Sequence, residues 1–100
     1  MANKNIVDSD FSIDENSLAQ LRSQITQLDE QIIQLISERQ DISRAIGQYK
    51  KNNNLPVYDK EREDKLNQFH KKICNSLGVS SSMIENIFNI IIEESRKVQK

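Results

Sequence analysis

Seven polar side chains fall on the apolar faces of three predicted helices and could do chemistry together. They comprise four cations, one carboxylate, one hydroxyl and one amide: Arg22, Arg39, Lys50, Arg62, Glu63, Ser95 and Gln99. Singly, each fits a rim charge or a member of a buried salt bridge, for instance Arg39 with Glu63. Together, the cations outnumber the anion, and a buried cation without a partner is costly. Because arginine binds carboxylates bidentately and lysine adds a compact charge, we predict a site for a small dianion with one further acceptor.

Other kinds of site have little support in this sequence. One histidine, His70, and one cysteine, Cys74, cannot build a usual zinc site, and two glycines leave no glycine-rich phosphate loop. Cys74 lies among apolar neighbours and is interpreted as a core residue, while His70 beside two lysines is interpreted as part of a solvated face. Neither a Ser-His-Asp nor a Cys-His arrangement is indicated. We therefore predict no metal, no cofactor and no covalent catalysis.

The composition is typical of one small soluble domain. The chain has 100 residues, of which 36% are hydrophobic and 29% charged, and its formal net charge is -1. A nearly neutral chain with few aromatics does not fit nucleic-acid binding. No run approaches the roughly 20 apolar residues of a membrane span, and residues 1–16 lack the apolar segment of a signal peptide. We expect a cytoplasmic protein in which residues 1–16 form a flexible N-terminal extension, with a short docking segment as the alternative.

Periodicity predicts an all-α fold with one long helix and two shorter ones. Apolar residues over 18–50 recur at steps of three and four, which gives one helix capped by Ser17 and ending near Asn52. Arg39 interrupts this stripe, and Gly47 indicates a close helix contact, room for a ligand or simply a tolerated glycine. A helix of about 35 residues is roughly 50 Å long, too long for a compact monomer of this size. We therefore expect an intertwined homodimeric helical bundle.

The two shorter helices follow a connector at Pro56, which disfavours helix for the residue before it. Asp59 is the predicted N-cap of the second helix, which ends near Leu77, with Gly78 as its C-terminal stop. Ser80 is the predicted N-cap of the third helix. The predicted inner face of the second helix comprises Arg62, Leu66, Phe69, Ile73 and Leu77; the third helix runs to about Val98 with an apolar stripe of Ile84, Ile87, Phe88, Ile91 and Ile92.

Five segments carry a resemblance to a known family. They are Leu21-Arg22-x-x-Ile25-x-x-Leu28-Asp29, Leu35-Ile36-x-Glu38-Arg39, Ile46-Gly47-x-x-Lys50, Pro56-Val57-x-Asp59-x-x-Arg62-Glu63 and Phe88-x-x-Ile91-Ile92-Glu93-Glu94-Ser95-x-x-x-Gln99. In this order they resemble the all-helical (type II) chorismate mutases over about residues 17–99. The resemblance implies a chorismate mutase-like helical domain over residues 17–100, with the N-terminal extension as the main departure.

The resemblance also implies a role for each polar position. Arg39 matches an arginine that holds a substrate carboxylate. Lys50 and Gln99 match the pair that hydrogen-bonds the ether oxygen of the breaking bond. Glu63, with the backbone near Asp59, matches the group that holds the ring hydroxyl.

Three further positions match substrate contacts of that family. Arg62 and Ser95 match contacts on the ring and carboxylate side, and Arg22 matches an arginine that reaches into the pocket of the partner subunit. Arg22 and Lys50 are 28 residues apart. This spacing corresponds to about 42 Å of helix, too far for one small ligand. We therefore expect the two residues to serve two different sites of a homodimer.

The implied reaction is the pericyclic rearrangement of chorismate to prephenate in phenylalanine and tyrosine biosynthesis. It needs no nucleophile, metal or redox cofactor, and proceeds by selection of a compact conformer and stabilisation of charge on the ether oxygen. Isochorismate pyruvate-lyases and 4-amino-4-deoxychorismate mutases are alternatives on the same scaffold. Glu63 directly after Arg62 favours a mutase over the lyase. An alternative from another class is a helical dimerisation module whose cations form an interaction face.

Overall fold

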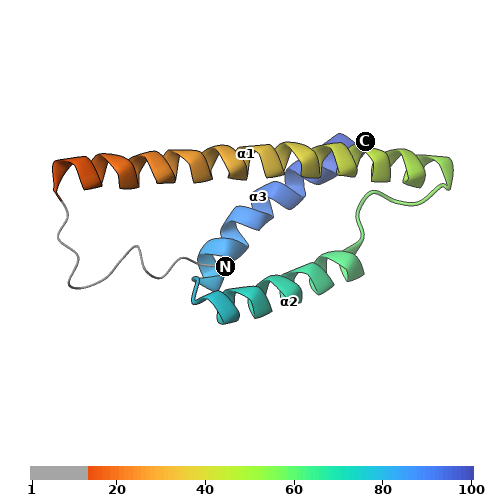
Figure 1. Cartoon of the computed structure of the whole chain (residues 1–100). Helices are drawn as coiled ribbons and strands as arrows, with labels where there is room; N and C mark the ends of the chain where they lie inside the picture. Colours follow the sequence, from red (N-terminus) through yellow and green to blue (C-terminus); the bar gives the residue numbers. More distant parts are fainter. Residues whose placement is uncertain (1–13) are drawn as a thin grey trace. The chain divides into compact units, whose positions relative to one another are not determined.

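The computed structural model describes residues 14–100, which form three α-helices (Figure 1). They are α1 over Glu15–Asn52, α2 over Lys60–Leu77 and α3 over Ser81–Gln99. The predicted fold class, one long helix and two shorter ones, is therefore confirmed for the single chain. Most of the predicted flexible extension, residues 1–13, lies outside the described residues. Within residues 14–100, no helix is long and apolar enough to cross a membrane.

The helix α1 begins three residues earlier than predicted, and its cap is Asp14 rather than Ser17. The Asp14 carboxylate accepts a hydrogen bond from the backbone N–H of Ser17 at 2.7 Å. This hydrogen bond lowers the pKa of Asp14. A carboxylate suits this place because the N-terminus of a helix carries partial positive charge. Glu15 and Asn16, which the sequence placed in the extension, are therefore helical.

The residues predicted to cap the two shorter helices do so in the structure. The Asp59 side chain accepts from the backbone N–H of Arg62 at 3.0 Å, and the Ser80 hydroxyl accepts from that of Met83 at 3.2 Å. Gly78 stops α2 in the left-handed conformation, with φ of 70°. A side chain is disfavoured at this φ, which explains the glycine.

The chain divides into two units at Leu35, and α1 runs through both. In the first unit, the apolar stripe of α1 is open to solvent. Ile25 is 59% exposed, and Leu28 and Ile32 are each 55% exposed. An apolar stripe of this kind normally packs against another element.

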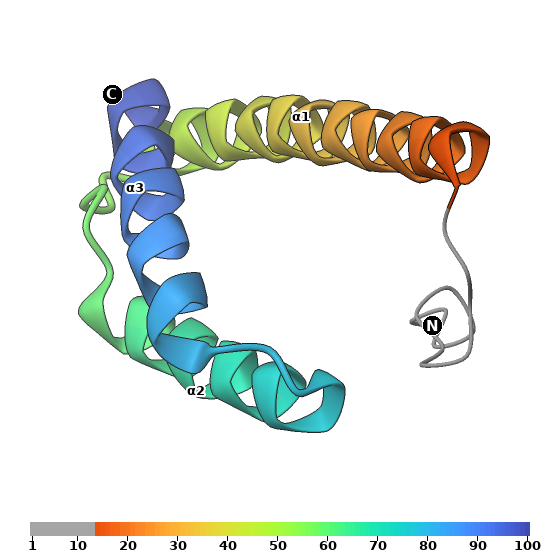
Figure 2. The ribbon, with the colours of Figure 1, turned by 90° about the vertical axis from the view of Figure 1, so that its left-hand side faces the viewer.

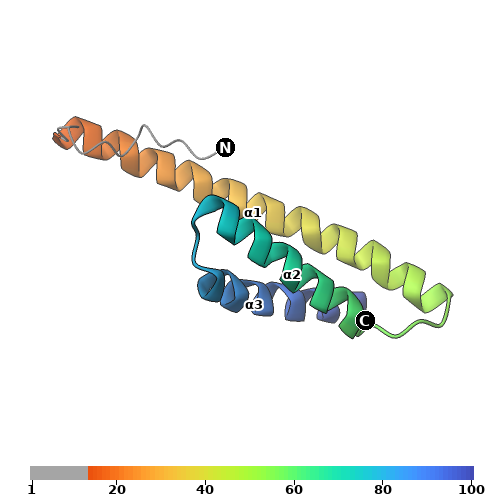
Figure 3. The same ribbon diagram turned by 90° about the horizontal axis from the view of Figure 1, so that it is seen from below.

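The second unit contains the end of α1, the connector, α2 and α3. The helices α2 and α3 pack side by side, as Figure 3 shows, and Cys74 of α2 and Ile92 of α3 are buried. The predicted core position of Cys74 is thus confirmed, at 4% exposure. In Figure 2 the end of α3 lies beside the last turns of α1. This unit therefore brings the C-terminal turns of two helices together.

The predicted inner face of α2 is confirmed at Leu66 and wrong at Phe69 and Leu77. Phe69 is 58% exposed and Leu77 is 57% exposed, whereas Glu63, Leu66 and His70 are partly buried. The reason is that α2 carries apolar residues on two sides, so that its sequence does not define which side meets α3.

The prediction that His70 belongs to a solvated face is also wrong. Its ring lies 4.0 Å from that of Phe88 between centroids, and the imidazole is half-buried. Burial lowers the pKa of His70, as do the nearby positive charges of Arg39 and Arg62. The neutral ring therefore packs as an aromatic residue between α2 and α3.

Candidate active site

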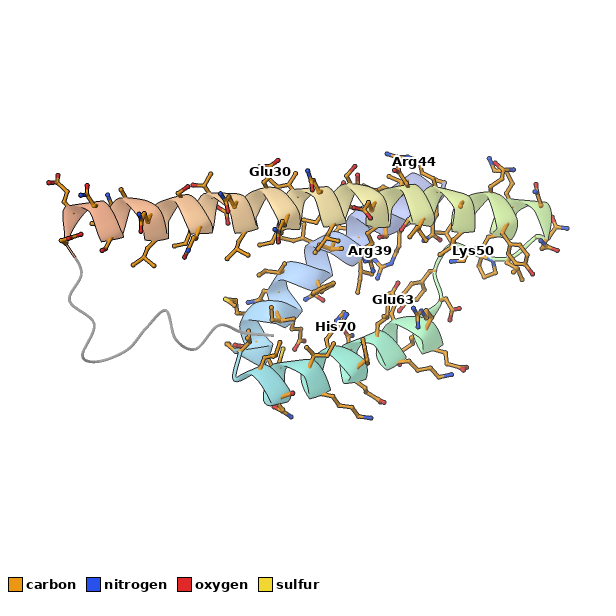
Figure 4. All side chains as sticks on the ribbon, viewed as in Figure 1. Glu30, Arg39, Arg44, Lys50, Glu63 and His70 are labelled. Carbon is orange, nitrogen blue, oxygen red and sulfur yellow. The ribbon has the colours of Figure 1, made fainter. Side chains whose placement is uncertain are left out.

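A pocket of about 380 Å³ lies wholly within the second unit. It is lined by the end of α1, the connector, the start of α2 and the end of α3. Seven of the eight residues predicted for the site line it: Arg39, Lys50, Asp59, Arg62, Glu63, Ser95 and Gln99. The eighth, Arg22, belongs to the first unit and does not line it. In Figure 4, the side chains of Arg39 and Lys50 point from α1 toward α2, and that of Glu63 points from α2 toward α1.

Lys50 and Gln99, which are predicted to bind the same substrate oxygen, lie together in this pocket. The Lys50 ammonium donates to the side-chain oxygen of Gln99 at 2.8 Å and to the backbone oxygen of Val57 at 2.7 Å. An ammonium has three donors, so one N–H of Lys50 remains for a ligand. The amide oxygen of Gln99 accepts from Lys50, which orients its NH₂ group as a donor. The pair thus offers two N–H donors from two helices.

Two serines on α1 and α3 orient the guanidinium of Arg39 through hydrogen bonds. The guanidinium of Arg39 donates to the Ser95 hydroxyl, which also accepts from the Ser43 hydroxyl at 3.1 Å. Both serines are almost fully buried, with 5% of Ser43 and 6% of Ser95 exposed. The sequence prediction missed Ser43. Its signal is positional, because Ser43 and Gly47 follow Arg39 at steps of four on the same face of α1.

Three of the four cations that line the pocket have no carboxylate partner among the described residues. Within residues 14–100, no salt bridge involves Arg39, Lys50 or Arg62. The pKa of Arg39 is lowered by burial and by the positive charge of Arg62. The lining carries four cations and two carboxylates, a formal charge of +2. A small dianion would neutralise this charge.

The fourth cation, Arg96, was missed by the sequence prediction. It donates to both oxygens of Glu63, from Nε at 2.8 Å and from Nη2 at 2.5 Å. This hydrogen bonding raises the pKa of Arg96. The alternative salt bridge of Arg39 with Glu63 is therefore wrong, because the Glu63 carboxylate is paired to Arg96. The available signal was the spacing of Arg96 one turn after Ile92 on the apolar stripe.

Gly47 marks a close contact between α1 and α3. It is buried, and a Cβ atom at this position would lie 2.5 Å from Cα and 2.6 Å from the backbone oxygen of Gln99. Of the alternatives for this glycine, the structure supports the close helix contact. The contact sets how deeply the end of α3 can approach Lys50.

Comparison with known proteins gives consistent matches over almost the whole described chain. A family model for type II chorismate mutases matches residues 21–100. A chorismate mutase of Methanocaldococcus jannaschii is 31% identical over 83% of this chain and 84% of its own. A bifunctional chorismate mutase/prephenate dehydratase of Buchnera aphidicola subsp. Schizaphis graminum is 38% identical over 86% of this chain, and this chain spans only 22% of that protein.

A solved structure has the same fold. It is a conserved hypothetical protein from Pyrococcus furiosus, with a TM-score of 0.69 and 33% sequence identity. The match covers 87% of this chain and 100% of that one. The two chains are therefore similar in sequence as well as in the arrangement of their helices.

Proposed function

This chain belongs to the type II chorismate mutase family, and we propose that its pocket catalyses the rearrangement of chorismate to prephenate. The observation that carries the proposal is the set of cations without carboxylate partners in a pocket of formal charge +2. Chorismate is a small dicarboxylate and supplies the two missing negative charges. The proposed setting is phenylalanine and tyrosine biosynthesis in the cytoplasm.

The proposed mechanism starts with the carboxylates. Arg39 binds one carboxylate, with its guanidinium oriented by Ser95 and Ser43, and Arg62 binds on the same side of the substrate. These contacts hold the flexible substrate in the compact conformer in which the new C–C bond can form. Fixing reacting groups in this way supplies up to roughly 7–11 kcal/mol in favourable systems.

The second part of the mechanism is electrostatic. Negative charge grows on the ether oxygen as the C–O bond breaks. The free N–H of Lys50 and the amide NH₂ of Gln99 donate to that oxygen, and their mutual hydrogen bond of 2.8 Å holds them in place beforehand. Donors fixed in advance stabilise a transition state without reorganisation. At the other end of the substrate, Glu63 accepts from the ring hydroxyl, next to the backbone of Asp59.

We infer that the active form is a homodimer of intertwined helices. The exposed apolar stripe of α1 in the first unit supports this proposal, since Ile25, Leu28 and Ile32 all stay more than half exposed in one chain. A second copy would cover this stripe. In that dimer Arg22 completes the pocket of the partner subunit and binds the substrate there.

A direct absorbance assay of chorismate consumption tests the proposed function. The expected product is prephenate, identified by chromatography. Isochorismate and 4-amino-4-deoxychorismate are offered in parallel reactions. Formation of salicylate and pyruvate from isochorismate, without prephenate from chorismate, would identify a lyase instead. Turnover of none of the three substrates would favour the helical dimerisation module.

Gly47→Ala is expected to lower kcat without unfolding the chain. The added methyl group pushes the Gln99 backbone away, because its ideal position is only 2.5 Å from Gln99 Cα. A displacement of about 1 Å costs up to roughly a hundredfold in rate. The control is Gln48→Ala on the adjacent exposed position, which should keep the wild-type rate. Wild-type kcat in Gly47→Ala, with unchanged helical content by circular dichroism, would contradict the role of this contact.

A further inference from the structure

Arg96 and Glu63 form a two-point ion pair at the wall of the pocket. Both Glu63 oxygens accept from the guanidinium, in the parallel geometry that fixes direction as well as distance. The Glu63 side chain is 18% exposed and that of Arg96 is 36% exposed. Arg96 therefore holds Glu63 in one orientation while both residues remain part of the pocket lining.

The connector supports this pair from the opposite side. The Arg96 guanidinium lies over the ring of Tyr58, 5.0 Å from its centroid, which is a cation–π distance. The preceding residue, Val57, accepts the hydrogen bond of Lys50. Two neighbouring connector residues thus each contact one cation of the pocket: Val57 contacts Lys50 and Tyr58 contacts Arg96. The position of Glu63 depends on a chain of contacts from Tyr58 through Arg96.

The ion pair also determines which charges the substrate meets. A carboxylate accepts hydrogen bonds and does not donate them. Because Arg96 pairs with Glu63, the carboxylate does not neutralise Arg39 or Arg62, and both remain available for substrate carboxylates. The remaining lone pairs of Glu63 form a fixed acceptor.

We propose that Arg96 is a positioning residue that fixes Glu63 as an acceptor toward the substrate ring. This inference rests on the proposed function, since it assigns the Glu63 end of the pocket to the ring. The acceptor suits a ring hydroxyl or a ring ammonium group, and it repels an additional carboxylate. Arg96 acts through Glu63 and does not itself need to touch the substrate.

A double-mutant cycle tests the inference, with kcat/KM for chorismate as the first readout. Arg96→Met is expected to lower kcat/KM up to about a hundredfold by releasing Glu63 from its position. Glu63→Gln lowers it as well. The double variant should be no worse than Glu63→Gln alone, because the two residues act as a unit. Arg96→Lys keeps the positive charge but loses the two-point hydrogen bonding of the guanidinium. Its kcat/KM should lie between that of Arg96→Met and that of the wild type.

The comparison of Arg96→Lys with Arg96→Met gives a readout that a merely structural role would not move. A residue that only fills space should be replaced about as well by methionine as by lysine. An ion-pair partner of Glu63 should be replaced better by lysine, which keeps the positive charge, so kcat/KM should recover in part. The remaining charged groups of the pocket are the same in these variants: Arg39, Lys50, Asp59 and Arg62.

The matched control is Lys97→Met. Lys97 is the next cation of α3 and pairs with Glu94 at 2.8 Å on the exposed surface, so its loss should leave kcat/KM unchanged. Additive losses in the cycle, or equal losses of kcat/KM in Arg96→Met and Arg96→Lys, would overturn the inference while the wild type still converts chorismate. A wild type without turnover of chorismate would overturn the proposed function and the inference with it.

Discussion

Lys50→Ala is expected to lower kcat for chorismate by roughly 10²–10³, the usual loss when one fixed donor to a developing negative charge is removed. Lys50 is held in the pocket by two acceptors, since Val57 and Gln99 each accept from it at less than 3 Å. The loss should appear in kcat more than in KM, because charge on the ether oxygen grows only as the bond breaks. Steady-state absorbance kinetics at saturating chorismate measures it.

Two further variants make this result interpretable. Lys51→Ala removes the neighbouring exposed cation of the same helix end and should keep wild-type kcat. Gln99→Ala removes the second donor to the same oxygen and should lower kcat in the same way. Circular dichroism should report the same helical content for all three proteins. Near-wild-type kcat in Lys50→Ala would refute the assignment of the ether-oxygen site.

Local signals in the sequence predicted the helices well. Each of Asp59, Gly78 and Ser80 makes the cap that its residue type favours, because a cap depends only on atoms within about one turn. The error at the start of α1 is of the same local kind: the sequence prediction chose Ser17 as the cap, and the hydrogen bond identifies Asp14.

Most of the residues that line the pocket could also be predicted, because polar residues on apolar helix faces are rare enough to stand out. The sequence did not predict which of these residues pair with one another. Whether Glu63 pairs with Arg39 or with Arg96 depends on how α2 rotates about its axis against α3, and α2 has apolar residues on two sides. The burial of His70 against Phe88 follows from the same rotation. Sequence periodicity gives the face of each helix only when one face is apolar.

The second large effect concerns the dimer. Arg22→Ala and Lys50→Ala should each be nearly inactive alone, yet a mixture of the two should regain activity after joint unfolding and refolding. In the proposed dimer, the pocket of an Arg22→Ala chain contains its own Lys50 and receives Arg22 from a Lys50→Ala partner. One of the two pockets in each mixed dimer is then complete. Random pairing at equal amounts gives about a quarter of the wild-type activity per chain.

The control for this experiment is a mixture of Lys50→Ala with Gln99→Ala. These two side chains meet within one chain, so every pocket of every dimer lacks one of them, and no recovery is expected. Recovery that requires the Arg22 variant therefore assigns Arg22 to the partner pocket and Lys50 to its own. Failure of the first mixture to recover, or full activity in a protein that sedimentation shows to be monomeric, would refute the shared site. In the proposed dimer, one interface both buries the exposed apolar stripe of α1 and completes the pocket, because the stripe lies on the same segment as Arg22.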